Sequence, residues 1–458
     1  MHSSEHVKID PSSLATPEKR SQYTVSVVGC GRMGLPHACL FADAGFKVIG
    51  VDKNPKILAA LASGRSPFEE PGLEEKVGKH IREGRFTITS NGEYAASKSD
   101  VIVLVVPTLV DEKLQPDYSY IEKACEEMGR GLRRGALFIV ASTVGPGVTE
   151  TLVKERLEKA SGLKAGRDFS LAYSPIRGMA GRVLRDIANY VRVVGGIDDK
   201  SVKLACKFLD TITKAGTIPV SSIKVAETFK LFLNVQRDLN LALANEFAML
   251  CERLGIDYLE VRELANVDPY SHLLFPGLVG GHIPKDPYLL IREAEGLGLD
   301  LTIAKTARKV NETMVDHSLQ LVVEALKECG KNPKESIVAV LGVSYRADIK
   351  ERIGSRAITL IESLSRRGVK VRVYDPYFRV EDLSDLGCPV GKTLEETVKG
   401  ADCIAITVGH RSFRELNLEE LKGLMAAKPA LVDLACLMNP KKVRETGFVF
   451  RGLGRPPR

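Results

Sequence analysis

Strand-length apolar runs alternate with segments of helical periodicity over the first half of the chain. Apolar runs cover residues 25–28, 47–51, 101–106 and 136–141, and the alternation continues to about residue 220. Strands separated by helices are typical of α/β domains, because each helix carries the chain back across the sheet to a parallel neighbour. The pattern therefore predicts a largely parallel, doubly wound sheet in this part of the chain.

The pattern changes after residue 220, where one long helix-compatible stretch begins. It runs from about Ser222 to Leu254 without Pro or Gly and is mostly apolar. Polar residues recur on one face at helical spacing, namely Glu227, Lys230, Asn234, Asp238 and Asn245. Since buried polar groups need partners, this polar face either lines a hydrated site or hydrogen-bonds a neighbouring helix, and the spacing leaves both interpretations open.

A third region repeats part of the first. An apolar run at 338–341 predicts a strand, and residues 369–374 lead to Asp375 much as residues 46–51 lead to Asp52. We therefore predict an α/β fold in which two Rossmann-like doubly wound domains are joined by a central helical domain that contains the long helix.

The predicted boundaries follow these changes of pattern. Residues 1–22 are polar, with Ser and Pro, and are predicted to form a disordered tail. The predicted domains are a first Rossmann domain at 23–220, a central helical domain at 221–330 and a C-terminal Rossmann-like domain at 331–458. The basic last residues, 451–458, are predicted to be a mobile tail.

Composition places the chain among globular proteins of more than one domain, since 458 residues with 44% hydrophobic content exceed a single core. The net charge of +7 is small and the basic residues are scattered, so we expect no nucleic-acid partner, although a polyanionic small molecule would suit this balance. The apolar runs are too short to span a bilayer and no signal peptide opens the sequence, so we expect a cytoplasmic protein without membrane contact. The nine cysteines show no metal-ligand spacing, so no metal site is predicted.

A glycine-rich turn with the fingerprint GxGxxG follows the first predicted strand. The first glycine permits a tight turn, the second lets backbone N–H groups approach a pyrophosphate, and the third lets helix and strand pack closely. A carboxylate about 20 residues further on would accept hydrogen bonds from a ribose and repel a 2′-phosphate, which favours NAD over NADP. The predicted NAD-binding residues of this unit are Gly29, Gly31, Arg32, Met33, Gly34 and Asp52.

Two later strand ends add to the predicted cofactor site, because the carboxyl ends of strands face the ligand crevice of a doubly wound sheet. Pro107 and Thr108 follow one strand, and Thr143 follows another within the sequence STVGPGVTE. Hydroxyl groups before Gly and Pro suit a ligand loop and equally a helix N-cap, and the sequence leaves this choice open.

Two further loops carry charge. Residues 275–288 combine many Gly and Pro with His282, Lys285 and Asp286, which favours ligand contact over a simple turn. In the third region, basic residues replace the glycine fingerprint before a helix that Ser355 is placed to cap. A basic loop at a helix N-terminus suits a diphosphate, and a solvated charged loop is the alternative.

Taken together, these motifs resemble the nucleotide-sugar 6-dehydrogenases, the family of UDP-glucose, UDP-N-acetylmannosamine and GDP-mannose dehydrogenases. The segments that carry the resemblance are the glycine turn, SPFEEPGLEE, STVGPG, AETFKLFLNVQRD, PGLVGGH, SYRAD and VYDPY. The resemblance implies an NAD domain, a central helical domain that pairs two subunits as a homodimer, and a C-terminal domain that binds the nucleotide-sugar substrate.

The resemblance also implies roles for individual residues. Lys230, Asn234 and Asp238 match the family's catalytic residues on the central helix, with Lys230 steadying an oxyanion and Asp238 orienting water or tuning the lysine. The implied substrate-binding residues are Phe275, Gly277, Gly281, His282, Tyr345 and Arg346.

Three positions depart from the family pattern. Family chemistry oxidises the sugar C6 alcohol twice, through a cysteine thiohemiacetal and a thioester. The pattern places that cysteine directly after His282, where this chain has Ile283, and the glutamate of Ser-Pro-Glu-Arg is replaced by Ile176. An arginine expected after the last strand is absent from residues 433–436.

We therefore predict NAD-dependent oxidation of a nucleotide sugar by an altered mechanism. The reaction would reach the acid through a hydrated aldehyde, stop after one hydride, or use a transient oxidation as an epimerase does. The alternatives are a non-catalytic paralogue that binds NAD and nucleotide sugar as a sensor or partner subunit, and an unrelated NAD-dependent dehydrogenase with the same three-domain plan.

Overall fold

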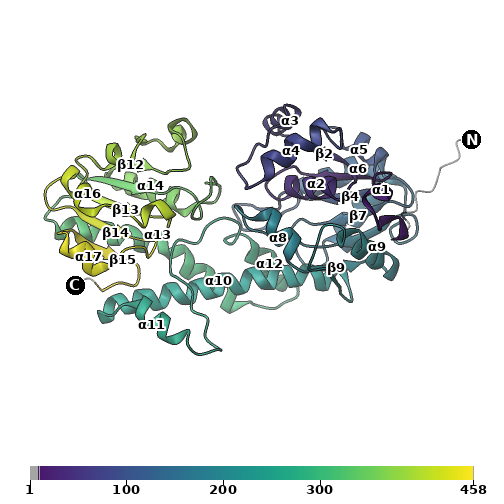
Figure 1. Ribbon diagram of the computed structural model, residues 1–458. Helices are drawn as coiled ribbons and strands as arrows, with labels where there is room; N and C mark the ends of the chain where they lie inside the picture. Colours follow the sequence, from purple (N-terminus) through teal and green to yellow (C-terminus); the bar gives the residue numbers. More distant parts are fainter. Residues whose placement is uncertain (1–8, 10, 457–458) are drawn as a thin grey trace, which may run out of the picture. The chain divides into compact units, whose positions relative to one another are not determined.

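The computed structural model describes residue 9 and residues 11–456. The chain divides into two compact units, one of Met1–Leu233 with Tyr288–Leu299 and one of Asn234–Pro287 with Asp300–Arg458. Each unit contains one large, mainly parallel sheet with helices packed against it (Figure 1).

The first unit is built on an eight-stranded sheet of order β10-β9-β8-β7-β4-β1-β2-β3. Neighbouring strands are parallel except β8 and β9. The strands are β1 (Thr24–Val28), β2 (Lys47–Val51), β3 (Phe86–Thr89), β4 (Val101–Leu104), β7 (Leu137–Val140), β8 (Ser170–Tyr173), β9 (Arg192–Gly196) and β10 (Thr217–Pro219), and β5 (Leu109–Val110) pairs with β6 (Pro116–Asp117) in a separate hairpin. The chain leaves β1 toward β2 and β3 and then crosses back to β4, so the topological switch point lies between β1 and β4.

Helices cover both faces of this sheet because alternate residues of each strand point to opposite sides. Val25 and Val27 of β1 enter one hydrophobic core with Phe41, whereas Val28 enters another with Ile121. The helices of the unit are η1 (Pro11–Leu14), α1 (Pro17–Arg20), α2 (Gly34–Asp43), α3 (Pro55–Ala62), α4 (Leu73–Arg82), α5 (Gly92–Lys98), α6 (Ser119–Gly131), η2 (Thr149–Val153), α7 (Lys154–Ser161), α8 (Val183–Asn189) and α9 (Asp199–Leu209).

The second unit contains a five-stranded, all-parallel sheet of order β12-β11-β13-β14-β15. Its strands are β11 (Ile337–Leu341), β12 (Lys370–Tyr374), β13 (Cys403–Ile406), β14 (Ala430–Asp433) and β15 (Val449–Gly452). Val338 and Val340 enter one core with Leu360, and Ala339 enters another with Phe413, so this sheet is also covered on both faces. Its switch point lies between β11 and β13.

Helices make up the rest of the second unit. They are α11 (Tyr258–Ala265), α13 (Thr302–Glu328), α14 (Arg356–Arg366), η3 (Val380–Leu386), α15 (Leu394–Val398), η4 (Arg411–Phe413), α16 (Leu418–Leu424) and α17 (Pro440–Glu445). Two helices pass from one unit into the other, α10 (Ile223–Leu254) and α12 (Asp286–Gly296). The bounds of α10 agree with the predicted Pro- and Gly-free stretch, and the predicted fold class, α/β with two doubly wound sheets and a long helix, is confirmed.

Both predicted tails contain ordered residues. Leu14 is buried and Ile9 joins the same core, while η1 and α1 lie within the segment expected to be disordered. At the other end, Leu453 is fully buried and the side chain of Arg455 pairs with Asp257. The buried apolar side chains of Ile9, Leu14 and Leu453, with the ion pair of Arg455, account for the difference from the expected loose tails. Residues 1–8, 10 and 457–458 lie outside the described residues.

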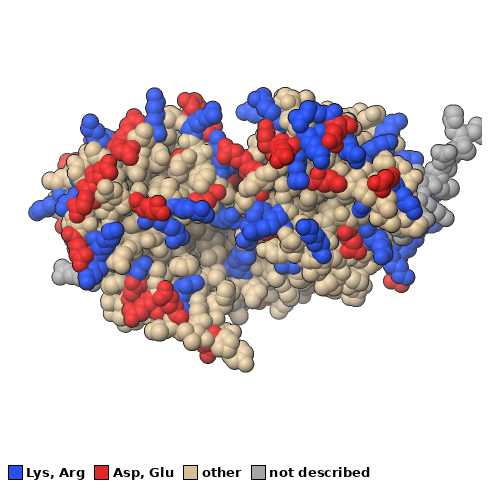
Figure 2. All heavy atoms as spheres, viewed as in Figure 1, with Lys and Arg blue, Asp and Glu red and all other residues tan. Residues whose placement is uncertain are grey.

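Charge is mixed over the face of the molecule in Figure 2, where Lys and Arg alternate with Asp and Glu. Among residue 9 and residues 11–456, no helix is long and apolar enough to cross a membrane. Within the same residues, no group of His, Cys, Asp and Glu side chains is arranged to hold a metal ion.

Candidate active site

The glycine turn after β1 leaves room for a diphosphate at one position only. Gly29 has φ +93°, and a Cβ there would overlap the carbonyl oxygen of Val105, while a Cβ at Gly34 would overlap the carbonyl oxygen of Gly29. These two glycines are therefore required by close backbone packing. At Gly31, in contrast, an added Cβ would meet no atom within 4 Å, so the outer side of the turn is open where a pyrophosphate would lie.

The N-terminus of α2 supplies hydrogen-bond donors at this turn. Met33 occupies the N-cap position and its side chain makes no capping hydrogen bond. The first N–H groups of a helix carry partial positive charge, which favours an anion at this end. The guanidinium of Arg32 lies 5.0 Å from the ring centroid of Phe68.

Asp52, at the end of β2, is held by backbone donors. One carboxylate oxygen accepts the N–H of Cys30 at 2.8 Å and the other accepts the N–H of Asn54 at 2.8 Å. These bonds fix the carboxylate beside the glycine turn, and each oxygen keeps a lone pair for a ribose hydroxyl. The turn, the uncapped helix end and this carboxylate together fit a dinucleotide.

The two later strand ends predicted to contact the cofactor follow the neighbouring strands β4 and β7, on one side of the switch point. Val105, the residue that Gly29 packs against, follows β4, and Thr108 comes three residues later. The Thr108 hydroxyl is buried and has no hydrogen-bond partner among the described residues, so it is available to a ligand group. Ser142 donates to the carbonyl of Val106 at 2.7 Å, which places Thr143 beside this strand end.

The loop after β7 is anchored by a buried glutamate of α10. Glu227 is fully buried, and its carboxylate accepts the N–H of Gly147 at 2.5 Å and the N–H of Thr149 at 2.9 Å. Burial raises the pKa of Glu227 to about 7, although these hydrogen bonds act to lower it. The hydroxyl of Tyr118 accepts the N–H of Gly145 at 3.0 Å in the same loop. The sequence placed Glu227 on the polar face without a role, and the structure shows that it positions this loop.

A buried arginine lies behind the glycine turn. Arg192 donates to His37 Nε2 at 2.8 Å and to the carbonyl oxygen of Ser174 at 3.1 Å, and His37 Nδ1 donates to the carbonyl of Met33 at 2.8 Å. Burial lowers the pKa of His37 to about 3, so its ring is neutral and this chain of hydrogen bonds has one direction. It links the turn to the segment that begins at Ser174 and contains Ile176. The sequence offered no signal for this contact, because 155 residues separate the two side chains.

Polar side chains of α10 hydrogen-bond to residues of neighbouring elements. Asn234 donates to the Asp286 carboxylate at 2.6 Å, and Lys285 donates to the other oxygen at 2.9 Å. Asp238 accepts from Arg308 at 2.7 Å and from Asn311 at 2.8 Å, with both Asp238 and Arg308 about 1% exposed. Burial raises the pKa of Asp238 from its usual value, although Arg308 and Asn311 oppose this shift.

Of the two interpretations that the spacing left open, hydrogen bonding to neighbouring elements holds for Asn234, Asp238 and Asn245. The Asn245 side chain donates to Asn311 at 2.9 Å and accepts the N–H of Gly277 at 2.8 Å. Lys230 is partly exposed and lies one helical turn before Asn234 on the same face.

The two glycine- and charge-rich loops of the second unit pack backbone to backbone. The N–H of Gly281 donates to the carbonyl of Gly354 at 3.0 Å, and a Cβ at Gly281 would lie 2.9 Å from the Tyr345 ring. The Tyr345 ring therefore lies directly on the loop that carries His282, which is exposed. Ile283, at the position of the family cysteine, is 6% exposed.

Phe275, at the start of the same loop, lies beneath a cation. The guanidinium carbon of Arg262 is 3.9 Å from the Phe275 ring centroid, and the ring is about half exposed. Both loops thus bring predicted substrate-binding residues together within the second unit. Ser355 is the N-cap residue of α14, as predicted, but its hydroxyl makes no capping bond and instead donates to the carbonyl of Ser344.

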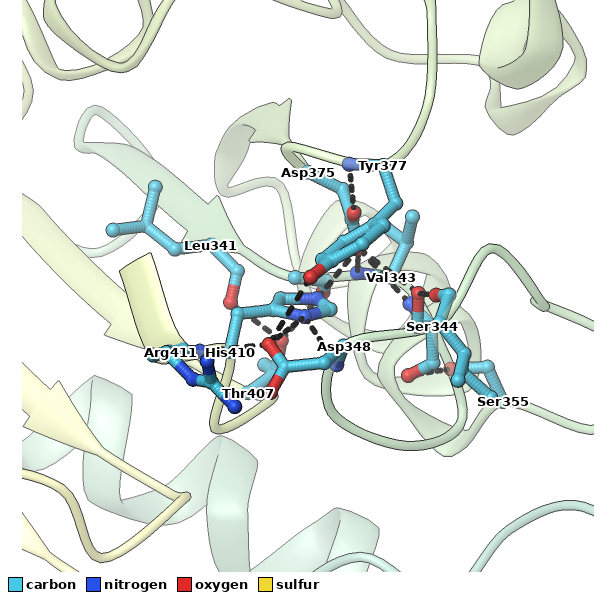
Figure 3. Close-up of polar contacts among 12 residues, drawn as sticks. Leu341, Val343, Ser344, Asp348, Ser355, Asp375, Tyr377, Thr407, His410 and Arg411 are labelled. Carbon is cyan, nitrogen blue, oxygen red and sulfur yellow. Dashed lines mark hydrogen bonds and ion pairs between the residues drawn. The ribbon is translucent and has the colours of Figure 1, made fainter. Parts of the chain in front are cut away.

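The switch point of the second sheet repeats the geometry of the first. Gly342 has φ +102° after β11, and its Cβ position would lie 2.6 Å from Val408 after β13, as Gly29 meets Val105 in the first unit. The Asp375 carboxylate accepts the N–H of Val343 at 2.7 Å, as Asp52 accepts that of Cys30 (Figure 3). The first glycine of the fingerprint is therefore retained in the second unit, whereas the other two are replaced by the loop of Tyr345 and Arg346.

These features define a class of protein, an NAD-dependent dehydrogenase whose dinucleotide domain is joined to a second Rossmann-like domain. Residues 23–213 match the NAD binding domain of the UDP-glucose/GDP-mannose dehydrogenase family, residues 224–313 its central domain and residues 339–440 its UDP binding domain. The chain belongs to the UDP-glucose/GDP-mannose dehydrogenase family.

Individual relatives are similar over their whole length. The UDP-N-acetyl-D-mannosamine dehydrogenase of Pyrococcus horikoshii is 35% identical, covering 94% of this chain and 99% of the relative. A solved structure of UDP-D-ManNAc dehydrogenase from the same organism has a TM-score of 0.87, with 95% of this chain and 100% of that chain covered. The UDP-N-acetyl-D-glucosamine 6-dehydrogenase of Salmonella typhi is 32% identical over 90% of this chain and 95% of the relative.

The matches confirm the predicted family, the enzyme class and NAD as cofactor. The match to the UDP binding domain also confirms a nucleotide sugar as the class of substrate. The domain boundaries, the roles of single residues, the altered mechanism, the homodimer and the cytoplasmic location stay predictions.

Proposed function

We propose that this enzyme oxidises the C6 alcohol of a UDP-linked N-acetylhexosamine to the aldehyde and transfers a single hydride. The names of the relatives from Pyrococcus horikoshii and Salmonella typhi support this class of substrate, and the second also supports oxidation at C6. Bound NAD supplies the acceptor for the hydride. The C6 hydroxyl loses its proton as the hydride leaves, so the products are the aldehyde, NADH and a proton.

The observation that supports a single oxidation is that none of the described cysteine thiols is activated. Ile283 is buried where the family pattern has its cysteine. Burial raises the pKa of all nine cysteine thiols, which lie within the described residues. A thiol that stays protonated is a poor nucleophile, so no thiohemiacetal forms to hold the aldehyde for a second hydride transfer.

The central helix provides the remaining groups of the proposed site. Lys230 is assigned to stabilising the developing charge on the C6 oxygen and to transferring its proton. Asp238 is assigned a positioning role, because Arg308 and Asn311 already occupy its carboxylate. Asn234 holds Asp286 at the start of α12 and so positions the loop that precedes it.

The test is the yield of NADH from a limiting amount of sugar. UDP-N-acetylmannosamine and UDP-N-acetylglucosamine are each incubated with excess NAD until the NADH absorbance stops rising, and hydroxylamine is added only afterwards, to detect the aldehyde as its oxime. We expect about one NADH per sugar, since the site has groups for the oxidation of the alcohol but no thiol for the oxidation of the aldehyde. A yield near two would contradict the single oxidation.

Mutation of the assigned lysine completes this test. Lys230→Ala is expected to lower kcat at least about a hundredfold, the usual contribution of a general acid or base. The matched control is Arg237→Ala, which removes an exposed cation from the same helix. Equal rates in both variants would remove Lys230 from the mechanism.

A second candidate function is non-catalytic binding of NAD and nucleotide sugar. The replacement of a glutamate by the buried, apolar Ile176 favours it, because one more proton-transfer group is missing. Tight binding of both ligands with no NADH formed from any UDP- or GDP-sugar would establish this function instead.

We also propose that two chains pair through α10. Leu243, Phe247, Leu250 and Leu254 are all at least 39% exposed, and their spacing of four, three and four residues places them on one stripe of the helix. An exposed apolar stripe of this kind is typical of a protein interface.

A further inference from the structure

His410 is a buried histidine at the switch point of the second sheet, beyond β13. Its side chain is fully buried, and it lies between the loop after β11, the end of β12 and the start of η4 (Figure 3). In an open α/β sheet ligands bind outside the carboxyl ends of the strands at such a point. Thr108 occupies the corresponding strand end of the first unit, where the cofactor residues are predicted.

The hydrogen bonds of His410 fix its tautomer. Nδ1 faces the backbone N–H of Asp348 at 2.9 Å and must therefore accept, which leaves the proton on Nε2. Nε2 lies 3.1 Å from the Asp375 carboxylate and donates to it. Burial acts to raise the pKa of Asp375, but the hydrogen bonds from His410 and from the backbone of Val343 hold that pKa below its usual value, so Asp375 is an acceptor.

Asp348 has a backbone conformation that needs this support. Its φ of +59° lies in the left-handed region, which residues with a side chain adopt uncommonly, although Asp does so more often than most. Besides the bond to His410, its carboxylate accepts the N–H of Arg411 at 2.8 Å and the hydroxyl of Tyr377 at 3.2 Å. Strained positions of this kind persist where surrounding contacts determine them, often at ligand clamps.

The strained residue lies two positions after Arg346 in the loop that carries the predicted substrate-binding pair. The same loop is tied at its start, where the Tyr345 N–H donates to the carbonyl of Glu351 at 2.9 Å. This bond closes the loop 345–351, so Tyr345, Arg346 and Asp348 belong to one short closed turn with Asp348 at its middle. Packing alone would not require an acceptor at Nδ1, because Phe413 and Tyr377 contact the His410 ring in any tautomer.

We propose that His410 is a positioning residue for the nucleotide-sugar site, which acts by holding the backbone of Asp348 so that Tyr345 and Arg346 are set for the UDP moiety. This inference rests on the proposed function, since it takes those two residues as contacts of the nucleotide. The Asp375 carboxylate orients the imidazole of His410, and the imidazole Nδ1 in turn fixes the backbone N–H of Asp348 in the loop.

Two substitutions of His410 separate its two hydrogen bonds. The amide oxygen of His410→Asn falls near Nδ1 and keeps an acceptor for Asp348, whereas the amide nitrogen of His410→Gln falls near Nε2 and keeps only the donor to Asp375. Affinity of the full-length chain for UDP is measured by titration calorimetry. We expect His410→Gln to weaken UDP binding about tenfold, because the bond that holds the Asp348 backbone is lost. His410→Asn keeps that bond and is expected to weaken UDP binding by no more than about twofold.

Two controls make the result specific. NAD affinity is expected to be unchanged in both variants, and KM for the nucleotide sugar to rise in His410→Gln while kcat stays near its wild-type value. Tyr377→Phe removes the partly exposed hydroxyl that donates to the Asp348 carboxylate and is expected to weaken UDP binding about threefold. This variant replaces the His410 variants in the test if they do not fold.

Three results would overturn the inference. Equal UDP affinity in wild type and His410→Gln, or equal losses in the Asn and Gln variants, would show that His410 serves packing only. If Tyr377→Phe bound UDP as tightly as the wild type does, the contacts of Asp348 would have no effect on nucleotide binding. If the wild-type chain bound GDP but not UDP, the proposed substrate would fail first, and the same comparison with GDP would still decide the role of His410.

Discussion

At position 283 a buried isoleucine occupies the place that the family pattern assigns to a nucleophilic cysteine. An alkyl side chain forms no thiohemiacetal, and Ile176 removes the carboxylate that the same pattern uses for proton transfer. These two residues are the basis, at the residue scale, of the proposed single oxidation. Neither change disturbs the core, because both side chains are buried and apolar.

Restoring these groups is expected to restore the second step. The double variant Ile176→Glu with Ile283→Cys should raise the final yield from about one to about two NADH per sugar, since a thiol can again hold the aldehyde for oxidation. The single variant Ile176→Glu is the control and should stay near one. A yield that remains near one in the double variant would mean that residue 283 does not reach the sugar C6.

Glu227 makes stability depend on pH in a defined direction. Its pKa is about 7 in the folded chain against 4.5 as an ordinary value, so between these pH values the folded state keeps a proton that the unfolded state has lost. Its contribution to stability is therefore fully present below pH 4.5 and is lost as the pH rises through about 7.

The comparison is with Glu227→Gln, which does not titrate. The free energy of unfolding of the wild type relative to this variant should fall by up to about 3 kcal/mol between pH 4.5 and 7.5. Urea-induced unfolding at several pH values measures the difference. A difference that is flat, or that rises with pH, would contradict the raised pKa.

At the scale of elements, α10 and α13 are joined by a buried ion pair within the second unit. Asp238 and Arg308 are about 1% exposed, and Asn311 completes the hydrogen bonds of the carboxylate. Removing one partner of a buried pair leaves the other charge without compensation, which costs more than the pair itself contributes.

Arg308→Met is therefore expected to destabilise the protein by about 3–5 kcal/mol. Adding Asp238→Asn should recover part of this loss, because the unpaired charge is then removed. Urea-induced unfolding of both single variants and the double variant measures the coupling. Simple additivity of the two single effects would show that the ion pair contributes nothing specific.

The helices and strands are more predictable from the sequence than the side-chain contacts between them. The bounds of α10 and the main strands follow from periodicity and from the positions of Gly and Pro, which act within a few residues. Asp238 was recognised as polar on an apolar helix, but its partner Arg308 lies 70 residues away and no local pattern identifies it. His410 was missed, although it follows a strand end just as Thr108 does, and the same rule would have marked it.

At the scale of the whole molecule, the exposed stripe on α10 predicts self-association. The double variant Leu250→Glu with Leu254→Glu should convert a dimer into a monomer, because two charges would be buried at the proposed interface without partners. Light scattering after size-exclusion chromatography gives the mass of each. Glu246→Gln, an exposed change on the same helix, is the control, and a wild-type chain that is already monomeric would contradict the proposal.

The polypeptide passes between its two compact units at three places, after Leu233, Pro287 and Leu299. A protease nick beside the exposed Leu297 would therefore not release either unit, since residues on both sides of the cut contribute to the second one. The two fragments should migrate together under native conditions and separate only in denaturant. A truncated gene that ends at Pro287 should accordingly yield insoluble protein, because residues 234–287 would lack the rest of the second unit that they pack against.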